Sequence, residues 1–211
     1  MFIDTHIHES KFSPDSHAPL SGILAQARRV GLDAICITDH DDNEIRYEAR
    51  ALSAEIGYLI IPGCEVLTHE GDVVVFGVDD LPKEKVHAAE LLAYVNARGG
   101  VGISAHPFRT NNRGLGENLR SVPGLAGVEG FNGNTDLEHN LQACQLAGAL
   151  GLPIFGASDS HHVPQVGKYA TWFPDEIRTE ADFVAAVRAG NMRPAISLDG
   201  GFTLLDYVRE Q

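Results

Sequence analysis

Short runs of apolar and β-branched residues alternate along the chain with longer segments whose apolar residues recur at helical spacing. The short runs predict seven strands, which in chain order read FIDTH, DAICITD, YLIIPGCEV, DVVVFGV, VGISAH, LAGVEGFN and PIFGASD. The longer segments predict helices at 20–30, near 43–56, and at 86–99, 139–151 and 180–190. Strands that alternate with helices in this way favour a mainly parallel sheet with the helices outside it.

Glycines punctuate the pattern where helices are expected to stop. Gly31, Gly99 and Gly151 each follow a helical segment, as C-terminal glycines do. The longest irregular piece is 109–121, rich in Asn, Gly and Arg, and a loop of that length is usually functional or mobile. Because no repeat, low-complexity segment or long linker interrupts the alternation, we expect one domain over residues 1–211.

The charge balance narrows the partners that this chain is expected to have. Its net charge of −13 argues against a protein that holds long nucleic acid through a basic surface. A site whose positive charge comes from bound metal stays compatible with it, because ions are often the largest local charges. Some of the acidic excess is then available as metal ligand.

Cysteine usage and hydropathy favour a cytoplasmic protein that does not enter a membrane. The three cysteines, Cys36, Cys64 and Cys144, are odd in number and widely spaced, so they suggest neither a disulfide framework nor a CxxC zinc site. Cys36 lies in the apolar run AICIT and is expected to be a buried thiol. No signal peptide and no apolar run long enough to cross a bilayer are visible.

Acids and histidines recur where the predicted strands end. His6 and His8 are two residues apart in the strand pattern, so their side chains share a face. Similar side chains end the other strands, namely Asp39, His40, Glu65, His106, Asp159 and His161. Barrels and open parallel sheets build their active sites at the C-terminal ends of their strands. The joint pattern therefore indicates one convergent site, whereas any single member also fits a polar strand end.

The residue types at these strand ends select the chemistry. Imidazole and carboxylate ligands suit Zn, Mn and Fe(II), and the absence of paired thiolates argues against a structural Cys site. The sequence GASDS is not the GxSxG elbow of serine hydrolases, and no GxxxxGK[ST] phosphate loop occurs. A cluster of two metals generates hydroxide at neutral pH and stabilises both oxygens of a phosphoryl displacement.

The order of these motifs resembles that of the PHP (polymerase and histidinol phosphatase) family. The motifs are DTHIH, SPDS (13–16), ITDHD (37–41), GCE (63–65), SAHP (104–107) and SDSH (158–161). The resemblance covers nearly the whole chain and implies a distorted (β/α)7 barrel of the TIM type. It also implies two or three divalent metals, commonly Zn, Mn or Fe, and hydrolysis of phosphoesters.

Carried over position by position, the resemblance implies eight ligands. They are His6, His8, Asp15, His40, Glu65, His106, Asp159 and His161. Glu65 and Asp159 would be the shared or bridging carboxylates. Two positions depart from the family pattern, since Asp72 stands where members with three metals often have His, and Phe131 and Asn132 stand near a frequent His or Cys. We therefore expect two firmly bound metals and leave the third open.

Three polar residues are candidates for orienting the ligands by hydrogen bonds to their outer sides. Asp4 and Asp39 are placed to accept the outer N–H of a ligand histidine. Asp39 equally suits a helix N-cap, and both interpretations stay open. Asn132 is a poor transition-metal ligand beside imidazole, so we assign it to this supporting group.

The substrate phosphate is expected to need cationic side chains as well as metal. Arg109, just after AHPF, is the leading candidate, because guanidinium pairs with phosphate through two parallel hydrogen bonds. Arg113 and Lys168 are further candidates, and each of the three could instead be an exposed loop charge. His162, beside His161, is a candidate proton donor to the leaving group.

These features predict a metal-dependent phosphoesterase that acts on a small phosphorylated metabolite. A nucleotide, an oligonucleotide end, or a sugar or amino-alcohol phosphate would each fit, with metal-activated hydroxide as the nucleophile. One alternative is hydrolysis of an amide or carboxylic ester, because the same hydroxide attacks a carbonyl. Another is a metal-binding regulatory module without catalytic activity.

Overall fold

All seven strands that the pattern predicts are formed. The computed structural model describes residues 1–206 of the chain. The predicted strands are β1 (Phe2–Asp4), β2 (Ala34–Ile37), β3 (Leu59–Leu67), β4 (Asp72–Phe76), β5 (Val101–Ser104), β6 (Gly127–Asn132) and β7 (Ile154–Ala157). Three strands that the pattern did not predict follow them, namely β8 (Tyr169–Trp172), β9 (Arg193–Leu198) and β10 (Gly201–Leu204).

The helices also occupy their expected segments. They are α1 (Leu20–Val30), α2 (Ile45–Ile56), α3 (Ala88–Ala97), α4 (Leu137–Leu150) and α5 (Glu180–Ala189). Gly31 and Gly151 stop α1 and α4 with φ angles of 83° and 70°, a left-handed conformation that costs other residues energy. Two short 3₁₀ helices, η1 (Gly116–Arg120) and η2 (Val163–Gln165), lie in the connections.

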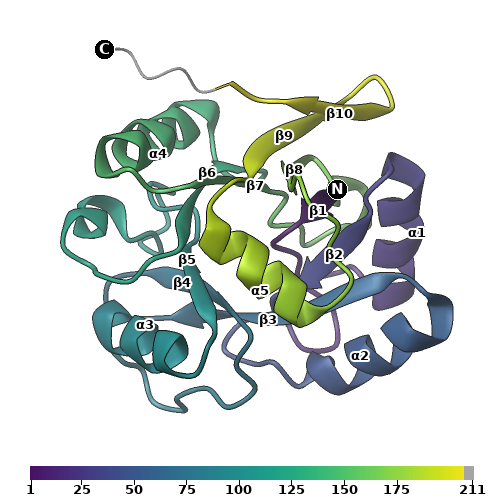
Figure 1. Cartoon of the computed structure of the whole chain (residues 1–211), viewed down its shortest axis with the longest axis horizontal. Coiled ribbons are helices and arrows are strands. Elements are labelled where there is room, and N and C mark those ends of the chain that lie inside the picture. Colours follow the sequence, from purple (N-terminus) through teal and green to yellow (C-terminus); the bar gives the residue numbers. More distant parts are fainter. Residues whose placement is uncertain (207–211) are drawn as a thin grey trace.

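The strands form one sheet that curls into a distorted barrel with helices outside it (Figure 1). Its order is β10-β9-β8-β1-β2-β3-β4-β5-β6-β7. The strands β1 to β3 are parallel, as are β5 to β7, but β4 runs antiparallel to both of its neighbours. β8 pairs antiparallel with β1. The distorted barrel is thus confirmed, with more antiparallel pairing than the apolar pattern indicated.

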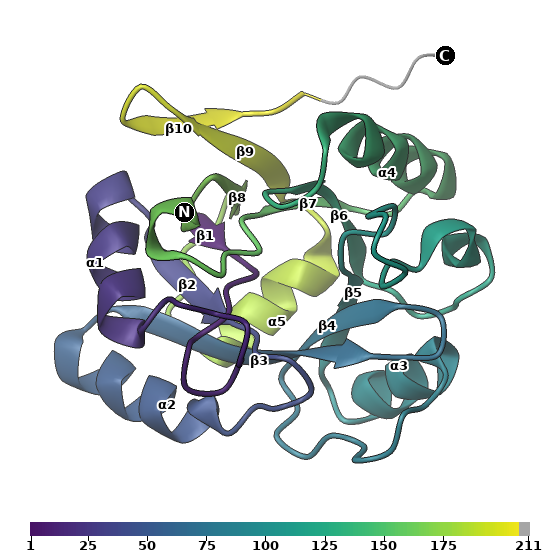
Figure 2. The ribbon, with the colours of Figure 1, turned by 180° about the vertical axis from the view of Figure 1, so that it is seen from behind.

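Parallel pairing brings the polar ends of the strands to one end of the barrel. Asp4 pairs with Ile35 of β2, and Ile37 pairs with Pro62 of β3, so β1, β2 and β3 point the same way. A single bridge then places His40 opposite Glu65. The loops that follow β1, β5 and β7 gather at the same end, which faces the viewer in Figure 2.

The opposite end of the barrel is covered by α5, which lies across it in Figure 1. Phe183 of this helix is fully buried and contacts two other rings, Phe76 at 5.0 Å and Phe173 at 5.6 Å between centroids. Aromatic side chains bury more apolar area than any others, so this trio closes the core beneath the strands. The three packed rings and α5 therefore close the core at this end of the barrel.

Further sequence expectations concern cysteines, membranes and domain extent. Cys36, Cys64 and Cys144 are all buried and free. Within residues 1–206, no helix has the length and apolar character that a membrane crossing requires. The predicted domain range of 1–211 includes 207–211, which lie outside the described residues.

Replacing Phe183 by Ala is expected to lower the free energy of unfolding by about 3–5 kcal/mol, because it opens a cavity where the three rings meet. Urea denaturation measures this loss. Leu137→Ala is the control, since Leu137 is 59% exposed and its truncation should cost no more than about 0.5 kcal/mol. Equal losses in the two variants would contradict the closing role of Phe183.

Candidate metal centre

The eight ligands implied by the sequence lie together at the C-terminal end of the barrel. His6 and His8 follow β1, His40 follows β2, and Glu65 lies inside β3. His106 follows β5, and Asp159 and His161 follow β7, while Asp15 lies on the loop between β1 and α1. His6 and His161, which are 155 positions apart in the sequence, thus share one site.

Glu65 lies at the centre of the cluster and is almost completely buried. One of its carboxylate oxygens is 2.8 Å from His106 Nε2, and the other is 2.7 Å from His40 Nδ1. His6 Nε2 lies 3.5 Å from the first oxygen. The surrounding imidazoles outweigh the effect of burial and hold the pKa of Glu65 well below its usual range.

Asp159 is the second central carboxylate. Its Oδ1 lies 3.2 Å from His8 Nε2 and 3.6 Å from His6 Nε2. The same oxygen is buried and has no hydrogen-bond partner within residues 1–206. Burying a carboxylate oxygen without a partner costs free energy, so Asp159 Oδ1 is well suited to bind a cation.

Three groups of side chains bring their ligand atoms within 4.8 Å of one another. The groups are His6, His8 and Asp159; His8, His40 and His161; and Glu65, Asp72 and His106. In the first, the Nε2 atoms of the two histidines are only 2.9 Å apart. Mixed imidazole and carboxylate donors in such sets fit divalent ions like Zn, Mn and Fe(II).

Asp15 joins the cluster from a more exposed position. Its side chain is 57% exposed, and Oδ2 lies 3.1 Å from His40 Nε2 and 3.3 Å from His161 Nε2. The positions of these two imidazoles hold the pKa of the carboxyl group low despite partial burial. Asp15 therefore extends the His40 and His161 pair into a second donor set.

The two histidines of β1 differ in their electrostatic surroundings. Burial lowers the pKa of His8 to about 4, so its ring is neutral at physiological pH and has a lone pair for a metal. Burial acts on His6 in the same direction, but Glu129, Asp159 and Glu65 outweigh it and raise its pKa well above the usual value.

Glu129 is a central residue that the sequence reasoning missed. It lies inside β6 and is buried, and its Oε1 is 2.7 Å from His6 Nδ1. Its Oε2 accepts the backbone N–H of His106 at 3.1 Å and a side-chain N–H of Asn132 at 2.9 Å. The available signal was an acidic residue within an otherwise apolar strand, GVEGFN, where burial demands a partner.

The expected contacts of Asp4 and Asp39 with histidine rings are wrong. Asp4 accepts backbone N–H groups, from Ser158 at 2.9 Å and from Gly167 at 2.8 Å, and burial raises its pKa to about 6. Glu129 of β6 holds the position beside the outer nitrogen of His6, 2.7 Å from Nδ1, while the Asp4 carboxylate is engaged by backbone N–H groups.

The side chain of Asp39 is linked to His8 through the hydroxyl group of Ser13. It accepts the Ser13 hydroxyl at 2.7 Å, and that oxygen lies 3.2 Å from His8 Nδ1. The alternative N-cap interpretation is also wrong, since α2 begins at Ile45. Ser13, in the SPDS motif, is thus a second residue that the sequence reasoning missed.

Asn132 and Arg109 form a polar bridge beside Asp159. Arg109 Nη2 donates to Asn132 Oδ1 at 2.8 Å and also pairs with Asp159 Oδ2. Asn132 Nδ2 donates to the same Asp159 oxygen at 3.2 Å. The amide oxygen of Asn132 is therefore engaged by donors and orients its neighbours, while Arg109 lies at the edge of the cluster with a side chain that is 17% exposed.

Of the other residues expected to act on the substrate, Arg113 lies beside the candidate ligands, whereas Lys168 and His162 lie apart from them. Arg113 pairs with Asp72 and lies 3.5 Å from His40 Nδ1 through Nη2. Lys168 is exposed and donates to the backbone carbonyl of Gly133, away from the ligand atoms. His162 is exposed and stacks on His17 with 5.0 Å between ring centroids. Neither Lys168 nor His162 contacts a ligand side chain within residues 1–206.

Two of the candidate ligands have backbone conformations that non-glycine residues rarely adopt. The φ angle is 25° at His106 and 50° at Asp159. Such conformations cost of the order of 1–3 kcal/mol each and occur often at functional sites. They turn both side chains inward directly after β5 and β7.

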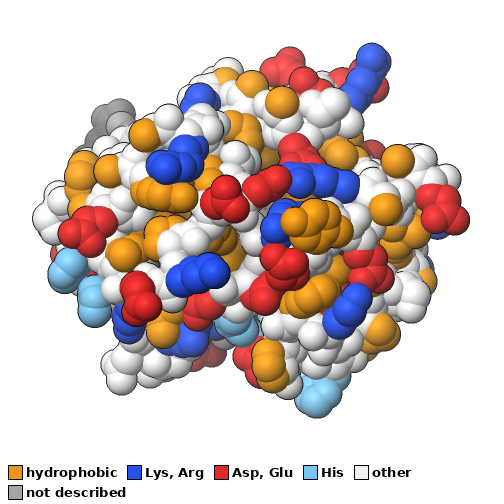
Figure 3. Space-filling view, turned by 90° about the horizontal axis from the view of Figure 1, so that it is seen from below, with side chains coloured by type: hydrophobic (Ala, Val, Ile, Leu, Met, Phe, Trp, Pro, Cys, Tyr) orange, Lys and Arg blue, Asp and Glu red, His pale blue; other side chains and the backbone are white. Residues whose placement is uncertain are grey.

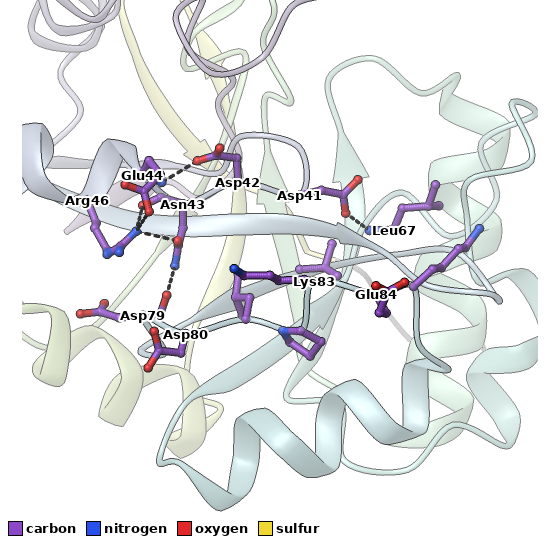
Figure 4. A pocket seen from close by; sticks show the side chains of 14 residues that line it. Asp41, Asp42, Asn43, Glu44, Arg46, Leu67, Asp79, Asp80, Lys83 and Glu84 are labelled. Atoms are coloured by element: carbon purple, nitrogen blue, oxygen red, sulfur yellow. Dashed lines mark hydrogen bonds and ion pairs between the residues drawn. The ribbon is translucent and has the colours of Figure 1, made fainter.

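A separate hollow of about 600 Å³ lies beside the outer face of β3 (Figure 4). Charged side chains from 41–46 and 79–85 line it, and none of the candidate ligands does. Its one buried cation, Arg46, is bound by Asn43 and Glu44 at 2.9 and 2.8 Å. The hollow is therefore distinct from the metal centre.

Comparison with known proteins bears directly on this centre. The PHP domain model matches residues 4–114, and a PHP-associated model matches residues 138–192. An uncharacterised protein of Methanocaldococcus jannaschii is 32% identical over 143 residues, which span 63% of this chain and 82% of that protein. Ribonuclease P protein component 3 of Natronomonas pharaonis is 27% identical over 113 residues, 52% of this chain and 46% of that protein.

Solved structures share the fold at lower sequence identity. PsfC from Pseudomonas syringae has a TM-score of 0.75 at 21% identity, covering 94% of this chain and 92% of that one. A Bifidobacterium adolescentis protein assigned as a metal-dependent phosphoesterase has a TM-score of 0.63 at 20% identity, covering 75% and 87%. The lesion-specific endonuclease EndoQ of Pyrococcus furiosus has a TM-score of 0.62 at 16% identity, covering 92% and 58%. Since the PHP domain model matches residues 4–114, more than half of the chain, the chain belongs to the PHP domain family.

Proposed function

We propose that this protein hydrolyses the phosphate ester of a small metabolite with two divalent transition metals bound at the C-terminal end of its barrel. The observation that carries the proposal is the convergence of buried imidazoles on the two central carboxylates, Glu65 and Asp159. Family membership and the phosphoesterase assigned to a structural neighbour support the same reaction class.

The protein supplies two donor sets for these ions. His6, His8 and Asp159 form the first, and Asp15, His40 and His161 form the second. Ions bound there would supply Lewis acidity and lower the pKa of water. Glu129 and Ser13 would keep the first set in place, because each contacts the outer nitrogen of one histidine, His6 and His8 respectively.

Arg109 is the side chain best placed to hold the substrate phosphate. Its Nη2 is bound by Asn132 and Asp159, and its Nε lies 3.3 Å from Thr135 Oγ1. Within residues 1–206, Nη1 has no protein partner, so it can donate to a phosphoryl oxygen. Charge that develops on that oxygen would then meet a donor that is already oriented.

The distribution of charge favours a small substrate over a long nucleic acid. The net charge is −13, and the face drawn in Figure 3 carries acidic side chains among its basic ones. A long nucleic acid is held by a contiguous basic surface, because most of its contacts go to phosphate. We therefore place the candidate substrates among nucleotides, oligonucleotide ends, and sugar or amino-alcohol phosphates.

Removing His8 should empty the first donor set. We expect wild-type protein to retain about two transition-metal ions per chain and His8→Ala to retain fewer, because His8 belongs to two of the three donor groups. Inductively coupled plasma mass spectrometry of protein purified without chelator measures this. The control is His17→Ala, an exposed histidine that stacks only on His162. Absence of metal in the wild type, even after incubation with Mn, Zn or Fe(II), would refute the proposal.

Glu129→Gln should weaken metal binding about 10–100-fold, as losses behind a ligand histidine typically do. Gln keeps the size of Glu129, but its NH₂ group would face a donor, either at His6 or at the His106 and Asn132 pair. Competition against a chelator measures the affinity, and thermal melting checks folding. Glu117→Gln, at a 66% exposed side chain, is the control. An affinity equal to that of the wild type would contradict the role of Glu129.

Arg109→Lys should lower kcat/KM for the best phosphate ester by about 10²-fold, because Lys cannot keep both the Asp159 bridge and a phosphate contact. Arg120→Lys, whose partner Glu117 is exposed, should leave the rate unchanged. The screen includes nucleotides, sugar phosphates, a 5′-phosphorylated oligonucleotide, carboxylic esters and amides. Turnover of esters or amides alone would favour the carbonyl hydrolase, and no turnover by metal-loaded protein would favour the regulatory module.

A further inference from the structure

The third donor group differs from the other two in what its carboxylate already binds. In the group formed by Glu65, Asp72 and His106, both oxygens of Asp72 are engaged by Arg113. Arg113 Nε lies 2.6 Å from Oδ2, and Nη2 lies 3.1 Å from Oδ1. This two-point pairing is the strongest geometry available between guanidinium and carboxylate. By contrast, Arg109 pairs with Oδ2 of Asp159, and Oδ1 faces the imidazoles of His8 and His6 at 3.2 and 3.6 Å.

The backbone holds this ion pair in place independently of its charges. The backbone N–H of Asp72 donates to the carbonyl oxygen of Arg113 at 2.6 Å. A Cβ on Gly71 would lie only 2.8 Å from that same oxygen and 2.5 Å from the carbonyl carbon of Gly114. Only glycine at position 71 permits this approach. Leu115, fully buried two residues beyond Arg113, anchors the segment in the core.

The guanidinium group places a positive charge beside the shared carboxylate. Arg113 Nη2 is 4.0 Å from Oε2 of Glu65 and 3.5 Å from His40 Nδ1. His106, the third member of the group, has its Nε2 2.8 Å from Glu65 and 3.8 Å from Asp72. A dication among these three residues would compete with Arg113 for Asp72 and be repelled by it.

We propose that Arg113 serves as a built-in cation of the third donor group, so that the protein binds two metal ions and Asp72 is not a metal ligand. The proposal rests on the proposed function, because it counts the ions in the same centre. In this proposal, the ion pair of Arg113 and Asp72 excludes a third metal ion. The positive charge beside Glu65 is then permanent and does not depend on metal supply.

Metal content per chain tests the proposal. Variants are equilibrated with excess Mn²⁺ or Zn²⁺, freed of unbound metal by gel filtration, and analysed by inductively coupled plasma mass spectrometry. We expect about two ions in the wild type, about three in Arg113→Met, and about two again in the double variant Arg113→Met/Asp72→Asn. Arg120→Met, which removes an exposed arginine from the same region, should retain the wild-type content. Three ions in the wild type, or no gain in folded Arg113→Met, would overturn the proposal.

Asp72→Asn alone provides a separate test that does not depend on Arg113→Met folding. The amide is isosteric with the carboxylate, and loss of Asp72 should leave the ion count unchanged if Asp72 binds no metal. Loss of an ion from Asp72→Asn would make Asp72 a ligand and overturn the inference, while the proposed function would stand. A wild type without metal would instead remove both. Circular dichroism confirms that each variant is folded before its metal content is compared.

Discussion

The hydrogen bond between Glu129 and His6 is the interaction on which the metal centre depends. Both groups are buried, and the charge of each is tolerated there because the other lies 2.7 Å away. The remaining oxygen of Glu129 binds His106 through its backbone and Asn132 through its side chain. One carboxylate in β6 thus couples the strand ends of β1 and β5 to the polar bridge beside Asp159. Loss of His6 would leave Glu129 Oε1 buried without this partner, and loss of Glu129 would leave His6 with the longer contacts to Glu65 and Asp159, at 3.5 and 3.6 Å.

The sequence predicted the seven central strands and the convergence of the ligands for a common physical reason. Buried strands appear as continuous apolar runs, and parallel strands bring their polar ends to one edge, so the site follows from the pattern. Strands β8 to β10 escaped prediction because their segments lack such runs. RPAISL of β9, for example, begins with a charge and a proline. Tertiary pairing forms them instead: β8 pairs with β1, β9 with β8, and β10 with β9.

The supporting residues of the site could not be predicted with the same success. The carboxylate of Asp4, next to the candidate ligands in sequence, accepts three backbone N–H groups, from His6, Ser158 and Gly167. Glu129, 123 positions from His6, and Ser13, five positions from His8, contact the histidines instead. The strand-end pattern therefore singled out the candidate ligands, but it did not single out the groups that contact their outer ring nitrogens. Which side chain lies behind an imidazole depends on the barrel's curvature, and no local pattern encodes that.

Helix α5 covers the end of the barrel opposite the candidate metal centre and so determines from which side a molecule can reach that centre. Because α5 and its buried Phe183 cover that end, the candidate metal centre lies at the other end of the barrel, on the side of the loops that follow β1, β5 and β7. A ligand of this centre would therefore enter from the side of the loops. The segment that bears Arg109 and Arg113 borders the centre, and Leu115 fixes that segment in the core. The size of molecule admitted can thus change through loop insertions, with no cost to the packing beneath.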